Sequence, residues 1–433
     1  MHHAELPIAL IVIASIILIS KLLQEKVKIP LPYSFISLSY LVYQNFPHIL
    51  PESFKTNFDE NILFLIPLIF MGDILHLKWA DLNKFKYSIL YLSIVSVTFS
   101  IIVGVSLYHF NLLNGLTIGM YVALFSIVMA TDAISVQGVL SQFKGIPHNV
   151  KILFEGESLG NDATAMIAFY FVGIPWILTG SFDFLSLPLI FAKVFIGSIL
   201  LGLITGYIGF LIMKQFKDSR SETLIIILSA YISFLGAEAL HLAGIASILA
   251  AIILLKALVD SEIEKTLNKE AKLARIEENP KFLSKYLKDA ASTKERMSSI
   301  QHIVSEYGYF ASVAIFVSLA ELINIENLIL YWREILIIFI STTLIRGVSM
   351  AKFWVIGSQT KHIDHINFSG WFILTMAGMK GALSIIMVHA LPADFMYKEM
   401  FESIVIGVIL LSIFFNGLAL IIFFNIKEKL IRK

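Results

Sequence analysis

The most constraining feature of the sequence is a series of long apolar runs, each of the length that a membrane-spanning helix requires. Crossing the hydrocarbon core of a bilayer takes about 20 predominantly apolar residues. Only 15% of the 433 residues are charged, whereas soluble domains carry about 25%. The sequence therefore predicts an all-α polytopic membrane protein with about 13 transmembrane helices. The runs lie at residues 7–23, 31–45, 61–76, 87–110, 115–140, 150–178, 184–213, 222–240, 242–258, 304–323, 328–357, 369–391 and 400–426.

The charged residues that remain are balanced in sign, with 33 Lys and Arg against 32 Asp and Glu. This balance excludes nucleic acid as a partner. The chain has no cysteine, so disulfides, thiolate metal sites and cysteine nucleophiles are excluded as well. We expect no cofactor, and no feature of the sequence indicates another protein as a partner. The composition instead indicates that the chain is surrounded by a lipid bilayer.

The predicted loops differ in their content of basic residues. Placing the N-terminus outside puts most of the 33 Lys and Arg residues on the cytoplasmic side, which is the bias that membrane proteins show. We therefore expect the N-terminus to lie outside and the C-terminus in the cytoplasm. The segment Met1–Pro7 contains no Lys or Arg, so the first apolar run is expected to be a retained helix and not a signal peptide.

Residues 256–303 form the one sizeable segment outside the apolar runs, and they are rich in Lys, Glu and Ala. Apolar residues recur there at helical spacing, so we expect a cytoplasmic amphipathic connecting segment. A regulatory or lipid-sensing role for this segment stays open. The segment is too short for a soluble catalytic domain. We therefore predict a single transmembrane transporter domain over residues 1–433.

Ionisable side chains occur inside the predicted spans, where each costs about 2.5–3.5 kcal/mol near the bilayer centre. Acids outnumber bases, so protonation, ion pairing or a bound cation must neutralise several carboxylates. This excess of acids indicates that protons and cations are the cargo. The acids are Asp73, Asp132, Glu155, Glu157, Asp162, Glu238 and Glu321, and the bases are Lys193, Arg346 and Lys380.

The sixth run holds the densest group of these side chains. At about 100° per residue, Glu155, Ser158 and Asp162 share one helix face. Glu157 and Asn161 share another face, about 140° away. The first face offers oxygen atoms near a titratable carboxylate, which suits hard cations such as Na⁺ and Li⁺. The second face offers a carboxylate and an amide that could hold a partner helix.

Two runs contain polar residues where a regular helix would be costly. The fifth run includes Thr131 and Asp132, which make sense if the helix unwinds there and exposes backbone groups to a buried ion. The twelfth includes Lys380 between Gly378 and Gly381, and a lysine at a break would offset the partial negative charge of a half-helix C-terminus. The fifth and twelfth runs are seven positions apart in the order of the predicted spans. We therefore expect two inverted six-helix repeats, with the seventh span as connector and crossed broken helices at spans 5 and 12.

Five stretches, in the same order, resemble the monovalent cation/proton antiporter family 1, and specifically the NhaP-like sodium/proton antiporters of bacteria and archaea, which are related to animal sodium/proton exchangers. The best match is Glu155–Ala165, which is similar to the family's EGESLxND segment. Ala133 stands where the family usually has proline, and Met71 stands where a glutamate is common. The other matching stretches are Leu65–Leu77, Ala130–Val136, Ala237–Ala246 and Gly378–Pro392.

The resemblance implies roles for the residues at matching positions. Asp162 would bind the proton and the cation in turn, and Asn161 completes the diagnostic pair. Thr131, Asp132 and Ser158 would supply further oxygen atoms to the cation. Three residues would support the site: Glu157 and Arg346, which we expect to contact each other and Asn161, and Lys380, which replaces the family's usual arginine.

The expected function is exchange of a monovalent cation, Na⁺ or Li⁺ before K⁺, for H⁺ by alternating access. The resemblance implies electroneutral exchange, because electrogenic relatives carry two acids where this chain has Asn161 and Asp162. It also implies a homodimer in the cytoplasmic membrane of a prokaryote. The alternatives are a K⁺/H⁺ antiporter of the same fold, an intramembrane enzyme or a channel. No H-E-x-x-H motif supports the enzyme, and no filter repeat supports the channel.

Overall fold

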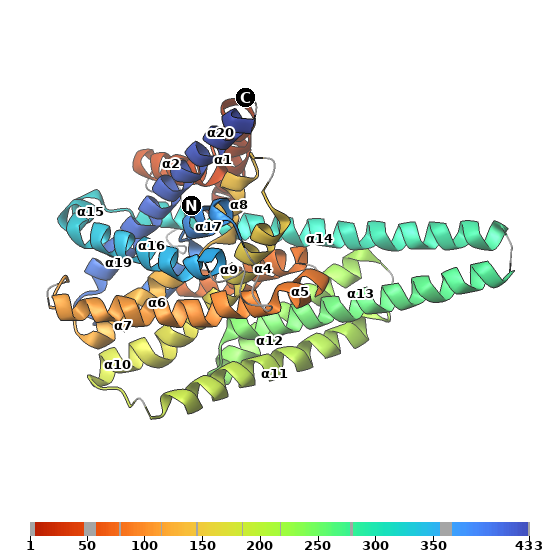
Figure 1. The fold of residues 1–433 in the computed structure, drawn as a ribbon, viewed down its shortest axis with the longest axis horizontal. Coiled ribbons are helices and arrows are strands. Elements are labelled where there is room, and N and C mark those ends of the chain that lie inside the picture. Colours follow the sequence, from red (N-terminus) through yellow and green to blue (C-terminus); the bar gives the residue numbers. More distant parts are fainter. Residues whose placement is uncertain are drawn as a thin grey trace. The chain divides into compact units, whose positions relative to one another are not determined.

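A computed structural model describes residues 5–46, 58–77, 79–113, 115–143, 146–183, 185–216, 218–277, 280–355 and 366–431. Within these ranges the secondary structure is helical, with no strand (Figure 1). The predicted all-α class is therefore confirmed. In chain order the elements are α1 (Glu5–Val27), α2 (Leu31–Asn45), α4 (Phe58–His76), α5 (Trp79–Leu90), the π-helix η2 (Tyr91–Ser96), α6 (Val97–Ser106), the 3₁₀ helix η3 (Leu107–Phe110), α7 (Ile118–Met129), α8 (Ala133–Leu140), α9 (His148–Ala168), the π-helix η4 (Phe169–Gly173), α10 (Ile174–Thr179), α11 (Leu187–Met213), α12 (Ser219–Ala239), α13 (Gly244–Glu277), α14 (Pro280–Leu322), α15 (Ile325–Leu330), α16 (Trp332–Val355), α17 (Phe368–Met376), α18 (Ala382–His389), α19 (Lys398–Leu411), the π-helix η6 (Ser412–Asn416) and α20 (Gly417–Ile431).

Eight helical stretches in the described part of the chain are long and apolar enough to cross a membrane. The other five predicted runs lie on α1, α2, α4, α14 and the pair α17 and α18. Each run is therefore mainly helical over its described residues, whereas the number of 13 membrane crossings stays a prediction. The eight stretches are Trp79–Phe110, Ile118–Leu140, His148–Thr179, Leu187–Met213, Ser219–Ala239, Gly244–Glu262, Trp332–Phe353 and Lys398–Lys427.

The chain divides into two compact units by its internal contacts. Unit 1 contains the residues that the sequence predicts for the ion site, and unit 2 contains α11, α12 and α13. The prediction of a single transporter domain concerns how the units act together and stays a proposal. Unit 1 is made of Met1–Phe64, Leu82–Pro188 and Ala311–Lys433, and unit 2 of Leu65–Asp81 and Leu189–Phe310.

In unit 2, α11 packs closely against α13 because glycines line the contact. A Cβ atom on Gly202 would lie 2.3 Å from the carbonyl oxygen of Ser247. A Cβ atom on Gly206 would lie 2.3 Å from the carbonyl oxygen of Ala251. Small residues of this kind let membrane helices approach at backbone distance and gain van der Waals contact, which replaces the hydrophobic driving force that lipid does not supply.

Charged side chains hold helix ends in unit 2. The buried ammonium of Lys256 donates hydrogen bonds to the carbonyl oxygens of Leu75 and Leu77, at the end of α4 where backbone carbonyls lack helical partners. Asp218, which lies before the first residue of α12, accepts a hydrogen bond from the N–H of Ser221 at 2.9 Å. This hydrogen bond to the ionised form holds the pKa of Asp218 below its usual value.

The predicted connecting segment, residues 256–303, is formed by the ends of two long helices. α13 continues to Glu277, and α14 begins at Pro280 and runs to Leu322. The segment is therefore continuous with the helices that carry the ninth and tenth apolar runs. Because the side chains of residues 266–294 lie outside the described part, the amphipathic pattern of this segment stays a prediction.

Two helix interruptions meet in unit 1, one between α7 and α8 and one between α17 and α18. The backbone N–H of Asp132, in the first, donates to the carbonyl oxygen of Met379, in the second, at 2.8 Å. A second link joins the flanking helices, because the Ser384 hydroxyl donates to the carbonyl oxygen of Ile127 at 2.8 Å. Both predicted interruptions are present. The first forms even with Ala133 at the position where proline is usual in the family that the sequence resembles.

Candidate cation-binding site

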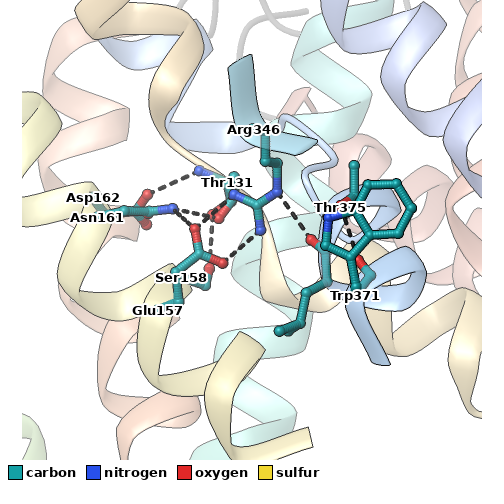
Figure 2. Close-up of polar contacts among 9 residues, drawn as sticks. Thr131, Glu157, Ser158, Asn161, Asp162, Arg346, Trp371 and Thr375 are labelled. Carbon is teal, nitrogen blue, oxygen red and sulfur yellow. Dashed lines mark hydrogen bonds and ion pairs between the residues drawn. The ribbon is translucent and has the colours of Figure 1, made fainter. Parts of the chain in front are cut away.

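Asp162 is buried within α9, with 6% of its surface exposed. Its Oδ1 accepts a hydrogen bond from the backbone N–H of Thr131 at 3.3 Å (Figure 2). Thr131 lies in the extended stretch between α7 and α8, so its N–H is available to a side chain because no helix uses it. The first interruption therefore presents its backbone to the carboxylate that the sequence predicts as the ion carrier.

Thr131 also links Asp162 to two other side chains of α9. The hydroxyl of Ser158 donates to the carbonyl oxygen of Thr131 at 2.8 Å, and Nδ2 of Asn161 donates to Oγ1 of Thr131 at 2.7 Å (Figure 2). Because Ser158 uses its proton on this carbonyl, the lone pairs of its own oxygen remain for a cation. The structure thus brings three of the four predicted ligands, Thr131, Ser158 and Asp162, together at one interruption.

The fourth predicted ligand, Asp132, turns its carboxylate toward the start of α8. The carboxylate accepts hydrogen bonds from the N–H of Ile134 at 3.2 Å and of Ser135 at 3.3 Å, and from the Ser135 hydroxyl. This is an N-cap, which satisfies N–H groups that have no partner at the beginning of a helix. Asp132 therefore has a structural task that is independent of cation binding.

Glu157 and Arg346 form a bidentate ion pair between α9 and α16. Nη1 donates to Oε1 and Nη2 donates to Oε2, each at 2.7 Å, while Nε donates to the carbonyl oxygen of Leu374 at 3.0 Å (Figure 2). Glu157 is 2% exposed, so the charges neutralise each other away from water. A fork of this kind fixes the relative position of the two side chains as well as their charge.

The prediction that Arg346 also contacts Asn161 is wrong. Three of the five N–H donors of the guanidinium bind the two carboxylate oxygens of Glu157 and one backbone carbonyl, and none binds Asn161. Asn161 instead donates Nδ2 to Oε1 of Glu157 at 2.8 Å as well as to Thr131, and its Oδ1 has no hydrogen-bond partner among the described residues. Asn161 is therefore the bridge between the ion pair and the first interruption.

Lys380 lies in the second interruption, between two glycines that make room for neighbouring side chains. A Cβ atom on Gly378 would lie 2.5 Å from Cδ of Arg346, and one on Gly381 would lie 2.5 Å from Cβ of Asp132. Lys380 is 5% exposed and lines a small cavity of about 10 Å³, which is room for about one water molecule. Most of the other side chains that line the cavity are polar: Thr342, Thr343, Arg346, Thr375, Ser412 and Asn416.

A sequence profile of the family described as "sodium/hydrogen exchanger, transmembrane" matches residues 11–426, which is nearly the whole chain. The chain belongs to this family. It is thus a multi-pass membrane protein of a cation/proton antiporter family, and the NhaP-like resemblance predicted from its motifs is confirmed.

Individual exchangers are similar over most of the chain. The Na⁺/H⁺ antiporter ApNhaP of Aphanothece halophytica is 26% identical over 363 residues, which cover 83% of this chain and 62% of that protein. The Na⁺/H⁺ antiporter NhaH of Halobacillus dabanensis is 27% identical over 380 residues, which cover 84% of this chain and 82% of that protein. The solved structure of the sodium proton antiporter MjNhaP1 from Methanocaldococcus jannaschii has the same fold, with a TM-score of 0.68 at 18% identity over 95% and 97% of the two chains.

Membership of the sodium/hydrogen exchanger family makes this chain a transporter and not an enzyme. One enzyme-like pattern does occur, because residues 156–160 have the G-x-S-x-G spacing of a hydrolase nucleophile elbow. That motif requires a sharp turn between a strand and a helix, whereas these residues lie inside α9. Ser158 is therefore assigned only to the candidate cation-binding site.

The backbone groups of the candidate site could not be predicted from the sequence. The carbonyl oxygen of Leu374 accepts from Arg346, and that of Met379 accepts from the backbone N–H of Asp132. Because any residue type can supply a carbonyl, the sequence contains no sign of these contacts. One missed side chain did leave a signal. Ser135 follows Asp132 by three residues, the spacing at which an N-cap carboxylate meets the first turn of its helix.

Replacing Gly381 by alanine is expected to lower exchange activity at least tenfold. The added methyl group would lie 2.5 Å from Cβ of Asp132, and overpacking of this kind costs about 1–3 kcal/mol and displaces the backbone. The measurement is cation-driven proton flux in liposomes together with the melting temperature in detergent. Gly347→Ala is the matched control, because its methyl group would find its nearest neighbour, Thr375, at 3.5 Å. Full activity in Gly381→Ala would show that the two interruptions do not need this close contact.

Proposed function

We propose that the chain exchanges a monovalent cation for H⁺ across the membrane, with Asp162 as the carrier of both ions. The observation that carries this proposal is a buried carboxylate, Asp162, beside the unwound backbone of Thr131 where two helix interruptions meet. Intramembrane carboxylates are functional sites by default, and helix interruptions are the binding device of secondary transporters. The protonated carboxyl would carry H⁺ and the ionised carboxylate would bind the cation, so the two ions would exclude each other.

The donor set suits a hard alkali cation, and we propose Na⁺ or Li⁺ as the cargo. Oxygen atoms of Thr131, Ser158 and Asp162 belong to one hydrogen-bonded cluster, and hard cations prefer oxygen ligands. Asp132 would complete the set with the lone pairs that its capping bonds leave. The relatives ApNhaP and NhaH are named as Na⁺/H⁺ antiporters. The second candidate is K⁺/H⁺ exchange by the same fold, since oxygen ligands alone do not distinguish these cations.

The proposal extends to the architecture around the site. Two inverted six-helix repeats, with spans 5 and 12 as their crossed broken helices, would bring the two interruptions together, and the contact of Asp132 with Met379 supports this arrangement. Lys380 would offset the negative ends of the half-helices. Residues 1–433 would act as one transporter domain by alternating access. We further propose a homodimer in the cytoplasmic membrane of a prokaryote, with the N-terminus outside and the C-terminus in the cytoplasm.

Proton flux in liposomes tests the exchange proposal. Purified protein is reconstituted with a pH-sensitive dye inside, and Li⁺, Na⁺, K⁺ and Rb⁺ are added outside in separate experiments. We expect a dye signal that grows with the concentration of Na⁺ or Li⁺. A response to K⁺ with none to Na⁺ or Li⁺ would favour the second candidate. If none of the four cations moved protons, exchange as such would be contradicted.

Exchange is expected to be electroneutral, with one cation moved for each proton. The Asn161–Asp162 pair contains one titratable acid, so one negative charge binds either one proton or one alkali cation. A membrane potential imposed with K⁺ and valinomycin should therefore leave the initial rate of Na⁺-driven proton flux unchanged. A rate or steady-state gradient that follows the imposed potential would show that the numbers of protons and cations moved are unequal.

A further inference from the structure

A polar stripe runs along α9 from an exposed residue to the proposed ion carrier. Lys151, Glu155, Ser158 and Asp162 are spaced four, three and four residues apart, so they share one helix face. The Lys151 side chain is 57% exposed and that of Glu155 is 9% exposed. Because α9 rises about 1.5 Å per residue, Glu155 lies about 10 Å from Asp162, toward the end at which α9 begins.

Two other helices, α8 and α1, supply polar groups along the same stripe. Nε2 of Gln137, on α8, donates to Oε1 of Glu155 at 3.1 Å. Just before the first residue of α8, Thr131 contacts Ser158 and Asp162. At the opposite end of α8, Nε2 of Gln24 on α1 lies 3.5 Å from the carbonyl oxygen of Gly138 and from the Ser141 hydroxyl. Polar atoms therefore follow the contact between α8 and α9 from residue 141 to the site.

In the other direction along α9, the face that carries Asp162 is apolar and continues with the buried residues Ala165, Met166 and Phe169. The buried Thr164 lies on another face and donates its hydroxyl to the carbonyl oxygen of Gly160. A hydrated cation is stabilised by oxygen atoms and dipoles and not by apolar side chains. Among the described residues of α8 and α9, the polar stripe thus leads to one membrane face only, the face at which α8 ends and α9 begins.

The two buried glutamates of α9 differ in how well their charges are compensated. Glu157 has a bidentate arginine at 2.7 Å. Glu155 has the neutral amide of Gln137, the ammonium of Lys151 at 3.7 Å and the exposed imidazole of His148 in its neighbourhood. Because water screens an exposed lysine, this ion pair is weak. Glu155 therefore keeps most of its attraction for a passing cation, whereas Glu157 does not.

We propose that Glu155 recruits the cation: it is the first buried carboxylate that a cation meets on its way from the α8–α9 face to Asp162. This inference rests on the proposed function and adds to it a residue that raises the affinity for the cation at one membrane face only. A negative charge on a low-dielectric wall raises the local concentration of cations. Glu155 would thus lower the apparent KM for cation presented at that face and would leave the opposite face unaffected.

The test is a comparison of Glu155→Gln with the parent, with cation presented at each face in turn. A single cysteine placed in the cysteine-free chain reports which face points outward in liposomes. We expect the apparent KM at the α8–α9 face to rise about tenfold at low ionic strength, to rise less in high salt because ions screen the charge, and to stay constant at the opposite face. The rate at saturating cation should equal that of the parent.

Two further variants separate recruitment from a structural role. Lys151→Gln removes the competing positive charge and should lower the KM at the same face, whereas a structural role would not predict any such gain. Glu155→Asp keeps the charge and should restore most of the parent affinity. An unchanged KM in Glu155→Gln, or a rise equal at both faces, would overturn the inference while active parent protein still supported the proposed function. A parent without cation-driven flux would overturn both.

Discussion

Asp162→Asn is expected to reduce cation-driven proton flux to the level of empty liposomes. The amide has the size of the carboxyl group and can accept the same hydrogen bond from the N–H of Thr131, but it neither titrates nor offers a negative charge to a cation. In the parent, proton and cation compete for one carboxylate, so the rate should rise and then fall with increasing pH. The measurement is flux over a pH series together with the melting temperature, which should stay near that of the parent.

Asp394→Asn is the matched control for this experiment. Asp394 is an exposed acid in the same unit, so its loss changes the total charge by the same amount without touching the site. It should keep the flux and the pH profile of the parent. Substantial flux from well-folded Asp162→Asn protein would remove Asp162 from its proposed role and direct attention to the other buried acids.

Arg346→Ala is expected to destabilise the protein strongly without retuning the ion site. The substitution leaves the buried carboxylate of Glu157 unpaired and the carbonyl of Leu374 without its donor. Breaking a buried pair costs about 3–5 kcal/mol in soluble proteins, and less where membrane helices find new partners. The melting temperature in detergent should fall sharply, and activity should fall with the folded fraction. Apparent cation affinity in that fraction should change little.

Two variants make the Arg346 experiment specific. Arg346→Lys keeps the charge but loses the fork, so it should recover part of the stability. The exchange Glu157→Arg with Arg346→Glu should recover part as well, because the direct contact between the two side chains is restored with reversed polarity. An Arg346→Ala protein that is as stable as the parent, but whose cation affinity is shifted tenfold, would show that the arginine tunes the site.

The fold features that the sequence predicts well depend on short stretches of chain. An apolar run of helical length needs no partner to be recognised, and a polar pair such as Thr131 and Asp132 inside such a run conflicts with a regular helix by itself. The predicted interruptions were of this kind. The division of α9 into two polar faces also needs helical geometry alone, and it separated Glu157 from the Ser158–Asp162 face correctly.

The contacts that the sequence did not predict depend on which elements meet. The position of Asn161 on its helix face indicates that its amide needs a hydrogen-bond partner, but it does not indicate which residue that partner is. The partner is Thr131, which lies in the unwound stretch where the backbone no longer follows a helix. The residue types alone leave Asp132 as either a ligand or a helix cap, and only the position of the α8 N-terminus shows the cap. The small cavity beside Lys380 is lined by residues from distant stretches, including Thr342 and Asn416, so no local pattern indicates it.

The pairing of Glu157 with Arg346 has a consequence for how the protein is made. The two residues are 189 positions apart in the chain, and ribosomes add about 5–20 residues per second. For roughly 10–40 s, each new molecule therefore holds a membrane-embedded carboxylate whose permanent counter-ion has not been synthesised. Truncated chains that end before α16 keep this charge indefinitely.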